Sequence, residues 1–159
     1  MNLPMSALST TLFLDFDGVT HPLHCHESKH FSCLPAIESV LREVPDVEVV
    51  ISSTWRLQYP LEKLRARFSA DIAKRVVDVT PLGWDPQECP DMLWSYPRHA
   101  ECWQWMRIHR WASDNWLAMD DRPFIFRPFF KNVIVTDGRT GAQGSVLAEL
   151  KQRLVQMSE

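Results

Sequence analysis

The stretch TLFLDFDG, from Thr11 to Gly18, decides the fold. Its first part is an apolar run with little alternation, which is typical of a strand buried on both faces, and the Asp-Gly pair at its end predicts a turn. Strands of this kind belong to parallel sheets that helices cover on both sides. The stretch therefore predicts a buried strand over residues 11–16, with Asp15 and Asp17 at its carboxyl end.

The rest of the chain alternates predicted helices with predicted strands. The strands are expected over residues 47–52, 76–79, 116–119 and 133–135, and the helices over 34–43, 98–112 and 145–155, with one more helix that begins at Pro60 and carries Leu61, Leu64, Phe68 and Ile72 on one face. An irregular loop is expected over residues 80–97 because of its Pro, Gly and Asp content. Alternation of this kind predicts an α/β fold, a three-layer Rossmann-like sandwich around a mainly parallel five-stranded sheet.

Composition limits the kind of protein further. With 159 residues, of which 45% are hydrophobic, we expect a single domain over residues 1–159, with residues 1–9 as a candidate disordered end. A net charge of -3 provides no overall attraction for nucleic acid or anionic lipid, so a phosphate group must be held by a local site. Because the chain shows neither a signal peptide nor a membrane span, we expect a cytoplasmic location and four free cysteines.

Polar side chains follow three of the predicted strands. They are Asp15 and Asp17 after the first, Ser52, Ser53 and Thr54 after the second, and Asp120 and Asp121 after the fourth. The carboxyl ends of parallel strands share one edge of the sheet, where ligands bind. Clustered carboxylates repel one another unless a cation neutralises them, and an all-oxygen set suits Mg²⁺. The alternative is structural: Asp-Gly forms a turn, and Asp-Asp caps a helix or loop.

Three segments resemble the motifs of a known superfamily. LFLDFDGVTHP (residues 12–22), VVISSTWR (49–56) and WLAMDDRP (116–123) resemble the first, second and fourth motifs of the haloacid dehalogenase superfamily. The short Thr-Trp-Arg and Asp-Asp-Arg-Pro sequences also resemble the capless domain of bacterial RNA-repair proteins. For the third motif, a Lys or Arg at the start of a helix, Arg98 is the candidate.

The resemblance implies roles for individual residues. Asp15 would attack phosphorus, and the Asp17 side chain would protonate the leaving oxygen and then activate water. Ser52 or Ser53 would donate a hydrogen bond to a phosphoryl oxygen, and Arg98 would offset the charge on those oxygens. The metal set is Asp15, Asp17 through its backbone carbonyl, Asp120 and Asp121, with Asp121 preferred over Asp120 as the direct ligand. The candidates for substrate contact are Gly18, His21, Thr54, Arg56 and Arg122.

These features predict a capless Mg²⁺-dependent phosphohydrolase that acts on a nucleotide or a nucleic-acid end. The intervals between Asp17 and Ser52 and between Thr54 and Arg98 are filled by predicted helices, a strand and loops, which leaves no room for an inserted cap domain. An uncovered site admits an extended substrate. The alternatives are a non-catalytic binding module of the same fold and a phosphoprotein phosphatase.

Two further patterns allow more than one interpretation. Trp103, Arg107 and Arg110 fall on the outward face of the helix over residues 98–112, where they could stack nucleic-acid bases or simply pack and be solvated. Glu101, Cys102, Trp105, Ile108, His109 and Ala112 are expected on the inward face. The segment over residues 21–33 is rich in His and Cys and could form a zinc-binding flap, although its spacing fits no standard zinc motif.

Overall fold

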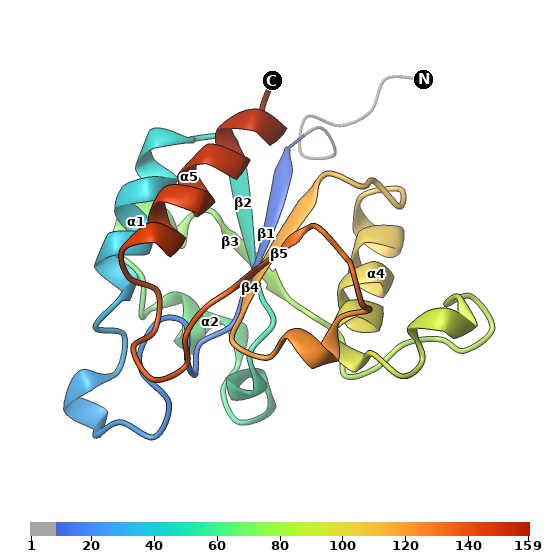
Figure 1. Cartoon of the computed structure of the whole chain (residues 1–159), viewed down its shortest axis with the longest axis horizontal. Coiled ribbons are helices and arrows are strands. Elements are labelled where there is room, and N and C mark those ends of the chain that lie inside the picture. Colours follow the sequence, from blue (N-terminus) through green and yellow to red (C-terminus); the bar gives the residue numbers. More distant parts are fainter. Residues whose placement is uncertain (1–8) are drawn as a thin grey trace.

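The computed structural model describes residues 9–159, which form a five-stranded parallel sheet with helices on both faces (Figure 1). We expected a disordered end over residues 1–9, and of these only Ser9 is among the described residues. The strand order is β3-β2-β1-β4-β5, and every pairing between neighbours is parallel. The strands are β1 Thr10–Leu14, β2 Val47–Ile51, β3 Val76–Val79, β4 Trp116–Asp120 and β5 Val133–Val135. The predicted α/β sandwich is confirmed, with a sheet that is entirely parallel.

The helices separate into two layers (Figure 1). Helices α1 and α5 lie side by side on one face of the sheet, and α4 covers the other. The α-helices are α1 Leu34–Glu43, α2 Leu61–Arg65, α3 Ala70–Ala73, α4 Pro97–His109 and α5 Ser145–Met157, and the 3-10 helices are η2 Glu27–Lys29, η3 Thr54–Leu57, η4 Asp91–Leu93 and η5 Pro123–Ile125. None of the helices formed by residues 9–159 is long and apolar enough to cross a membrane.

The central strand β1 is apolar throughout because both of its faces are covered. Leu12 and Leu14 are completely buried in the core beneath α1 and α5. Phe13 points to the opposite face, where its ring packs edge-on against Trp105, at 5.8 Å between centroids, and Trp116, at 5.3 Å. Successive strand residues point to opposite faces, so two separate cores require apolar side chains at consecutive positions.

The prediction of a single helix after Pro60 is wrong, because two short helices occupy that segment. Helix α2 ends at Arg65, and Ser69 precedes α3. The backbone N–H and the hydroxyl of Ser69 both donate to the buried carboxylate of Glu38, at 2.7 and 2.9 Å. Satisfying Glu38 in this way holds Ser69 in an extended conformation before α3. Leu64, Phe68 and Ile72 are nevertheless buried, as the apolar pattern predicted.

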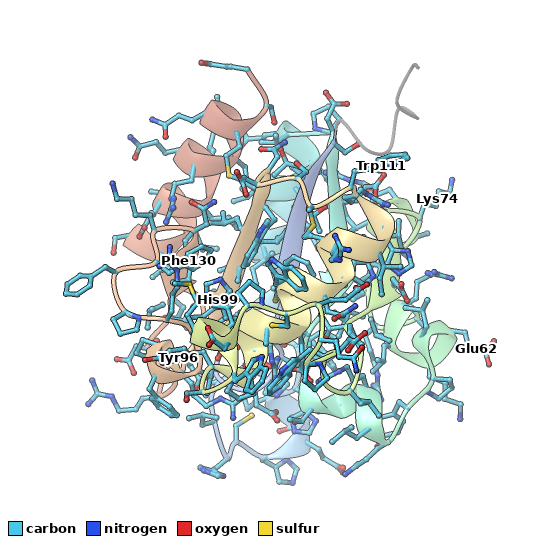
Figure 2. The ribbon with its side chains drawn as sticks, turned by 90° about the vertical axis from the view of Figure 1, so that its right-hand side faces the viewer. Glu62, Lys74, Tyr96, His99, Trp111 and Phe130 are labelled. Carbon is cyan, nitrogen blue, oxygen red and sulfur yellow. The ribbon has the colours of Figure 1, made fainter. Side chains whose placement is uncertain are left out.

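The inward face of α4 differs from the prediction near the end of the helix. Figure 2 looks onto α4, with Trp111 beyond its C-terminal end. Ile108 was expected to face the sheet but is 62% exposed, whereas Met106 is buried. His109 and Ala112 were also expected inward but are exposed. Burial follows position along the helix more than it follows one face. The buried residues of α4 run almost without interruption from Arg98 to Met106, and the exposed ones begin at Arg107.

The strand order indicates at which edge of the sheet a ligand would bind. The chain adds β2 and β3 on one side of β1 and then crosses over to add β4 and β5 on the other. The carboxyl ends of β1 and β4 therefore flank the topological switch point, where open α/β sheets bind ligands. Asp15 follows β1 directly, and Asp120 ends β4.

Candidate active site

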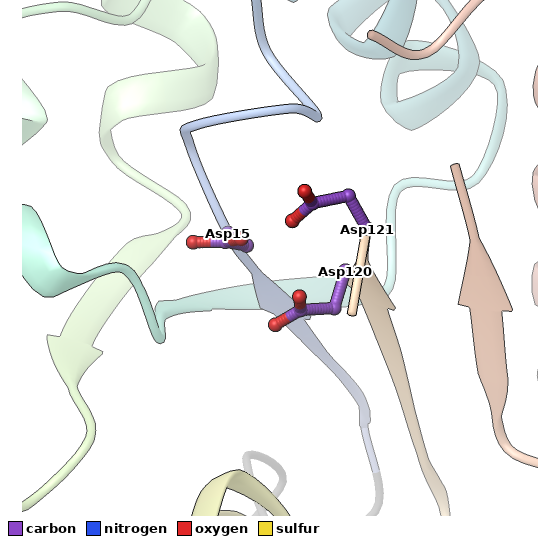
Figure 3. Close-up of side chains that lie close together, drawn as sticks. All are labelled: Asp15, Asp120 and Asp121. Carbon is purple, nitrogen blue, oxygen red and sulfur yellow. The ribbon is translucent and has the colours of Figure 1, made fainter. Parts of the chain in front are cut away.

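Three carboxylates meet at the switch point. Asp15 comes from the end of β1, and Asp120 and Asp121 come from the end of β4 (Figure 3). One oxygen from each carboxylate lies within 4.8 Å of the others. Since β1 and β4 are paired in register, with Leu14 opposite Met119, the residues that follow them are neighbours. The predicted convergence of the first and fourth motifs is therefore present in the structure.

The acidic cluster contains buried charge that its own side chains do not neutralise. Burial raises the pKa of Asp15 well above its usual range, and the neighbouring Asp120 raises it further, while Arg98 and Arg122 oppose the rise. Burial likewise raises the pKa of Asp120, whose Oδ2 is buried and has no hydrogen-bond partner. A divalent cation would favour the ionised form of both groups. The all-oxygen donor set and the orphaned oxygen fit Mg²⁺.

Arg98 is a buried cation next to this cluster. It lies in the first turn of α4, where Pro97 begins the helix, and its side chain is 5% exposed. Its Nη1 is 3.9 Å from Asp120 Oδ2, and its Nε is 3.5 Å from Glu101 Oε1. Neither nitrogen makes a hydrogen bond. A buried guanidinium with unused donors beside buried carboxylates can bind an anionic group there.

The Asp17 carboxylate lies apart from the three clustered carboxylates. Its side chain is 45% exposed, and its Oδ1 is 2.8 Å from Nε2 of His21 and 3.1 Å from Nε1 of Trp55. His21 was expected at the rim as a substrate contact, but it is only 1% exposed and its ring is turned to Asp17. Burial lowers the pKa of His21, although Asp17 opposes this shift. Trp55 was not identified from the sequence, although it follows the strand-end Ser-Ser-Thr directly.

The polar residues after β2 divide into buried and exposed positions. The backbone N–H of Ser52 donates to Leu14, which places Ser52 beside Asp15. Ser53 is completely buried, and its hydroxyl oxygen accepts the backbone N–H of Trp55 to cap η3. Thr54 is exposed. A cavity of about 240 Å³ opens over the site and is lined by Asp15, Asp17, Leu23, Thr54, Asp121 and Arg122.

Arg56 was expected to contact substrate. Instead it makes hydrogen bonds that hold the loops after β2 and β3 together. Its side chain is 5% exposed and donates to the backbone carbonyls of Ser52, Ser53, Thr80 and Pro81 and to the carboxylate of Glu101. With its donors engaged in this way, Arg56 does not reach the cavity. Arg122, by contrast, has a side chain that is 39% exposed and lines the cavity.

Glu101 is a second residue that the sequence analysis did not assign to the site. Its carboxylate accepts from Arg56 at 2.9 Å and from the backbone N–H of Gly83 at 3.0 Å, and it lies beside Arg98. An acidic residue on the inward face of a helix, three positions after a basic one, is the signal that could have revealed it. It balances the two buried arginines.

Gly18 allows the chain to approach Asp121 closely, and replacing it should disturb the acidic cluster. Its φ is +81°, and a Cβ there would lie 2.6 Å from Asp121 Cγ. We expect Gly18→Ala to cost about 1–3 kcal/mol of stability and to lower sharply the phosphate hydrolysis that the motif resemblance implies, because Asp121 must shift. Thermal unfolding and steady-state assays measure both effects. Gly144→Ala is the control: it has the same sign of φ, at +59°, but no neighbour within 4 Å, so it should lose stability and keep activity. Equal activity in both variants would contradict the contact with Asp121.

The first of the two open patterns, on the outward face of α4, agrees with packing and solvation of its side chains. Trp103 is partly buried against Cys89 and Leu93, Arg107 pairs with Glu88, and Arg110 lies beyond the end of α4, where it pairs with Glu48 over the Trp105 ring. Arg107 lies over the Trp103 ring, at 5.9 Å, but Arg110 lies over Trp105, so the three side chains do not share one face.

The histidine-rich segment shows no zinc site either. Within residues 9–159, the acidic cluster is the one group of three or more His, Cys, Asp or Glu side chains placed to hold a metal. His21 and His30 stack at 4.7 Å, and Cys33 donates to the Thr140 carbonyl. All four cysteines are free thiols, as predicted.

The parallel sheet, the Asp-x-Asp segment after β1 and the acidic pair after β4 together define a protein of the haloacid dehalogenase (HAD) superfamily. Within it, the chain belongs to the family described as the HAD domain in Swiss Army Knife RNA repair proteins, whose model matches residues 11–144. The comparisons with curated proteins and with solved structures gave no significant match. Membership of this family indicates a HAD-type phosphohydrolase.

Proposed function

We propose that this protein is a Mg²⁺-dependent phosphohydrolase that removes a phosphate from a nucleotide or a nucleic-acid end through an aspartyl-phosphate on Asp15. The observation that carries the proposal is the contrast between two carboxylates at one cavity. Asp15 is buried beside Arg98 and the other two carboxylates of the cluster, while Asp17 is half exposed and held by neutral donors. Two carboxylates in different environments suit a nucleophile and a general acid/base.

The proposed reaction has two half-reactions. In the first, a carboxylate oxygen of Asp15 attacks phosphorus, the bond from phosphorus to the leaving oxygen breaks, and Asp17 gives its proton to that oxygen. In the second, Asp17 takes a proton from water while the water oxygen attacks phosphorus, which releases inorganic phosphate and restores Asp15. Arg98 offsets charge on the phosphoryl oxygens in both. Both serines are buried, but the Ser53 hydroxyl already caps η3, so Ser52 is the proposed donor to one of these oxygens.

The residues that would hold Mg²⁺ are Asp15, the backbone carbonyl of Asp17, and Asp121, with Asp120 acting directly or through water. When bound, the cation supplies the positive charge that keeps the buried carboxylates ionised and draws the phosphate into the site. Thr54 and Arg122 line the cavity and would contact the substrate at its mouth.

Two observations support a nucleic-acid substrate. The family is described by its occurrence in RNA repair proteins. Between Asp17 and Ser52 the chain forms η2, α1 and β2, and between Thr54 and Arg98 it forms short helices, β3 and a loop, which supports the proposal of a capless site. An extended chain end can therefore reach the cavity without a domain having to open.

Metal dependence provides the direct test. We expect hydrolysis of p-nitrophenyl phosphate in Mg²⁺ and none in EDTA, because the carboxylates would then repel the phosphate dianion. Mg²⁺ at 100 times its Kd should also stabilise the fold by about 2.7 kcal/mol, measured by thermal unfolding. Activation by zinc alone would contradict the proposed site. Metal binding without hydrolysis would favour the non-catalytic binding module.

A substrate panel tests the second half of the proposal. It compares mononucleotides, oligonucleotides phosphorylated at the 3' or the 5' end, and phosphopeptides, each by released phosphate. We expect the highest kcat/KM among the nucleotides and oligonucleotides. Preference for the phosphopeptides would replace the nucleic-acid substrate with a phosphoprotein and leave the chemistry intact.

A further inference from the structure

The Asp17 carboxylate is held at one oxygen only. Nε2 of His21 and Nε1 of Trp55 both contact Oδ1, at 2.8 and 3.1 Å, while no donor among residues 9–159 contacts Oδ2. The two donors arrive from separate parts of the chain, since His21 lies four residues after Asp17 and Trp55 lies in η3 after β2. This asymmetry distinguishes the two oxygens of a group that must exchange a proton.

The direction of the His21 hydrogen bond follows from its other ring nitrogen. Nδ1 is 3.2 Å from the backbone nitrogen of Phe31, and a backbone N–H can only donate, so Nδ1 must accept. The hydroxyl of Thr20 is 3.2 Å from both Nδ1 and the Phe16 carbonyl and can donate its proton to either, so this contact requires no proton on Nδ1. The ring proton of the neutral imidazole is therefore on Nε2 and is donated to Asp17 Oδ1. The indole Nε1–H of Trp55 can only donate as well.

Local structure fixes both donors in place. The turn at Gly18, closed by the Gly18 N–H to His21 carbonyl hydrogen bond at 2.8 Å, brings the His21 ring back over Asp17. The Trp55 ring packs against Phe16 at 5.7 Å and Phe31 at 5.3 Å, and the capping bond from Ser53 holds its backbone. Neither side chain can rotate away without disturbing this aromatic cluster.

We propose that His21 and Trp55 are positioning residues that jointly hold Asp17 by Oδ1, so that Oδ2 carries the proton delivered to the leaving oxygen. The inference rests on the proposed role of Asp17 as general acid/base. An oxygen that accepts two hydrogen bonds is the acceptor whether the carboxyl group is protonated or ionised, so the proton is confined to Oδ2. His21 then acts through Asp17 and not by touching the substrate.

Three substitutions separate the hydrogen bonds from the fold. His21→Asn keeps a polar atom near the position of Nδ1 but has none near Nε2, so the Phe31 contact can persist while the Asp17 contact is lost. His21→Gln restores an amide N–H near the position of Nε2. Trp55→Phe removes the indole N–H and keeps an aromatic ring against Phe16 and Phe31. His30→Phe is the control, because His30 stacks on His21 but does not contact Asp17.

The readout is the dependence of kcat/KM on the leaving group. A simple alkyl phosphate needs protonation of its leaving oxygen more than p-nitrophenyl phosphate does, and general acid catalysis contributes about 10²–10⁴-fold. We expect His21→Asn to lower kcat/KM for the alkyl phosphate at least about tenfold more than for p-nitrophenyl phosphate, with KM little changed. Trp55→Phe should act in the same direction, His21→Gln should recover most of the loss, and His30→Phe should behave as wild type.

An equal loss on both substrates would show that His21 only maintains the fold, and no loss on either would show that holding Oδ1 is unimportant.

A second measurement does not depend on activity. Nitrogen-15 NMR of the histidine rings should find the proton of His21 on Nε2, and a proton on Nδ1 would overturn the inference. If the wild-type protein binds Mg²⁺ but hydrolyses no phosphate ester, the proposed function fails, whereas the NMR result still decides the geometry at Asp17.

Discussion

Replacing Asp15 by Asn is expected to lower hydrolysis by at least about 10³-fold, because the amide has the shape of the carboxylate but is not a nucleophile. Asp15 is 3% exposed and shares the acidic cluster with Asp120 and Asp121, which are fixed at the end of β4, so no nearby carboxylate can replace it without moving the strand ends. Single-turnover and steady-state assays with p-nitrophenyl phosphate measure the loss. A variant that keeps more than a few per cent of the wild-type rate in Mg²⁺ would show that Asp15 is not the nucleophile.

The same substitution should raise the stability of the metal-free protein. The folded state raises the pKa of Asp15, so its ionised form opposes folding: the penalty is absent below the pKa of the unfolded chain and grows as pH rises toward the folded value. At neutral pH an Asn avoids this penalty, and thermal unfolding in EDTA should show a higher Tm than wild type. Asp71→Asn removes an exposed carboxylate paired with Arg42 and should leave activity unchanged. A lower Tm for the Asp15 variant would mean that its carboxylate stabilises the fold without metal.

Replacing Arg98 by Met should damage both activity and stability. The change removes the cation that lies among Asp120, Asp15 and Glu101, and a buried charge left without its partner costs about 3–5 kcal/mol. Loss of one group that stabilises transition-state charge lowers kcat by about 10²–10³-fold. Chemical denaturation and kcat for p-nitrophenyl phosphate measure the two effects.

Arg98→Lys separates charge from shape in this test. The lysine keeps a cation at the start of α4 and should recover most of the stability and part of the activity. Arg107→Met, on the exposed side of the same helix, should change neither, because its pair with Glu88 is exposed to solvent. If Arg98→Met unfolds, the lysine variant still tests the role in catalysis. Full activity with an uncharged residue at position 98 would exclude Arg98 as the phosphate-stabilising cation.

Local patterns in the sequence were sufficient to predict the sheet and the acidic cluster. A fully apolar run such as Leu12 to Leu14 has few structural options besides a strand covered on both faces, and strands that alternate with helices pair in parallel. The carboxyl ends of such strands share an edge, so the convergence of Asp15, Asp120 and Asp121 follows from topology alone. Arg98 could be placed in the same way, because it begins the helix that leads to β4.

What only the tertiary structure decided is how each polar side chain uses its hydrogen bonds. Arg56 and Arg122 each follow a strand-end motif in the sequence. In the structure Arg56 donates its hydrogen bonds to backbone carbonyls, whereas Arg122 lines the cavity. Arg107 and Arg110 likewise pair with Glu88 and Glu48, which lie far from them in the sequence. Ser69, in the break between α2 and α3, donates to Glu38. Such choices depend on atoms from distant segments meeting within about 3 Å, and periodicity carries no information about them. The sequence therefore determined the sheet and its acidic edge, whereas the joint contact of His21 and Trp55 with Asp17 required the turn after β1 and the segment after β2 to be brought together by the fold.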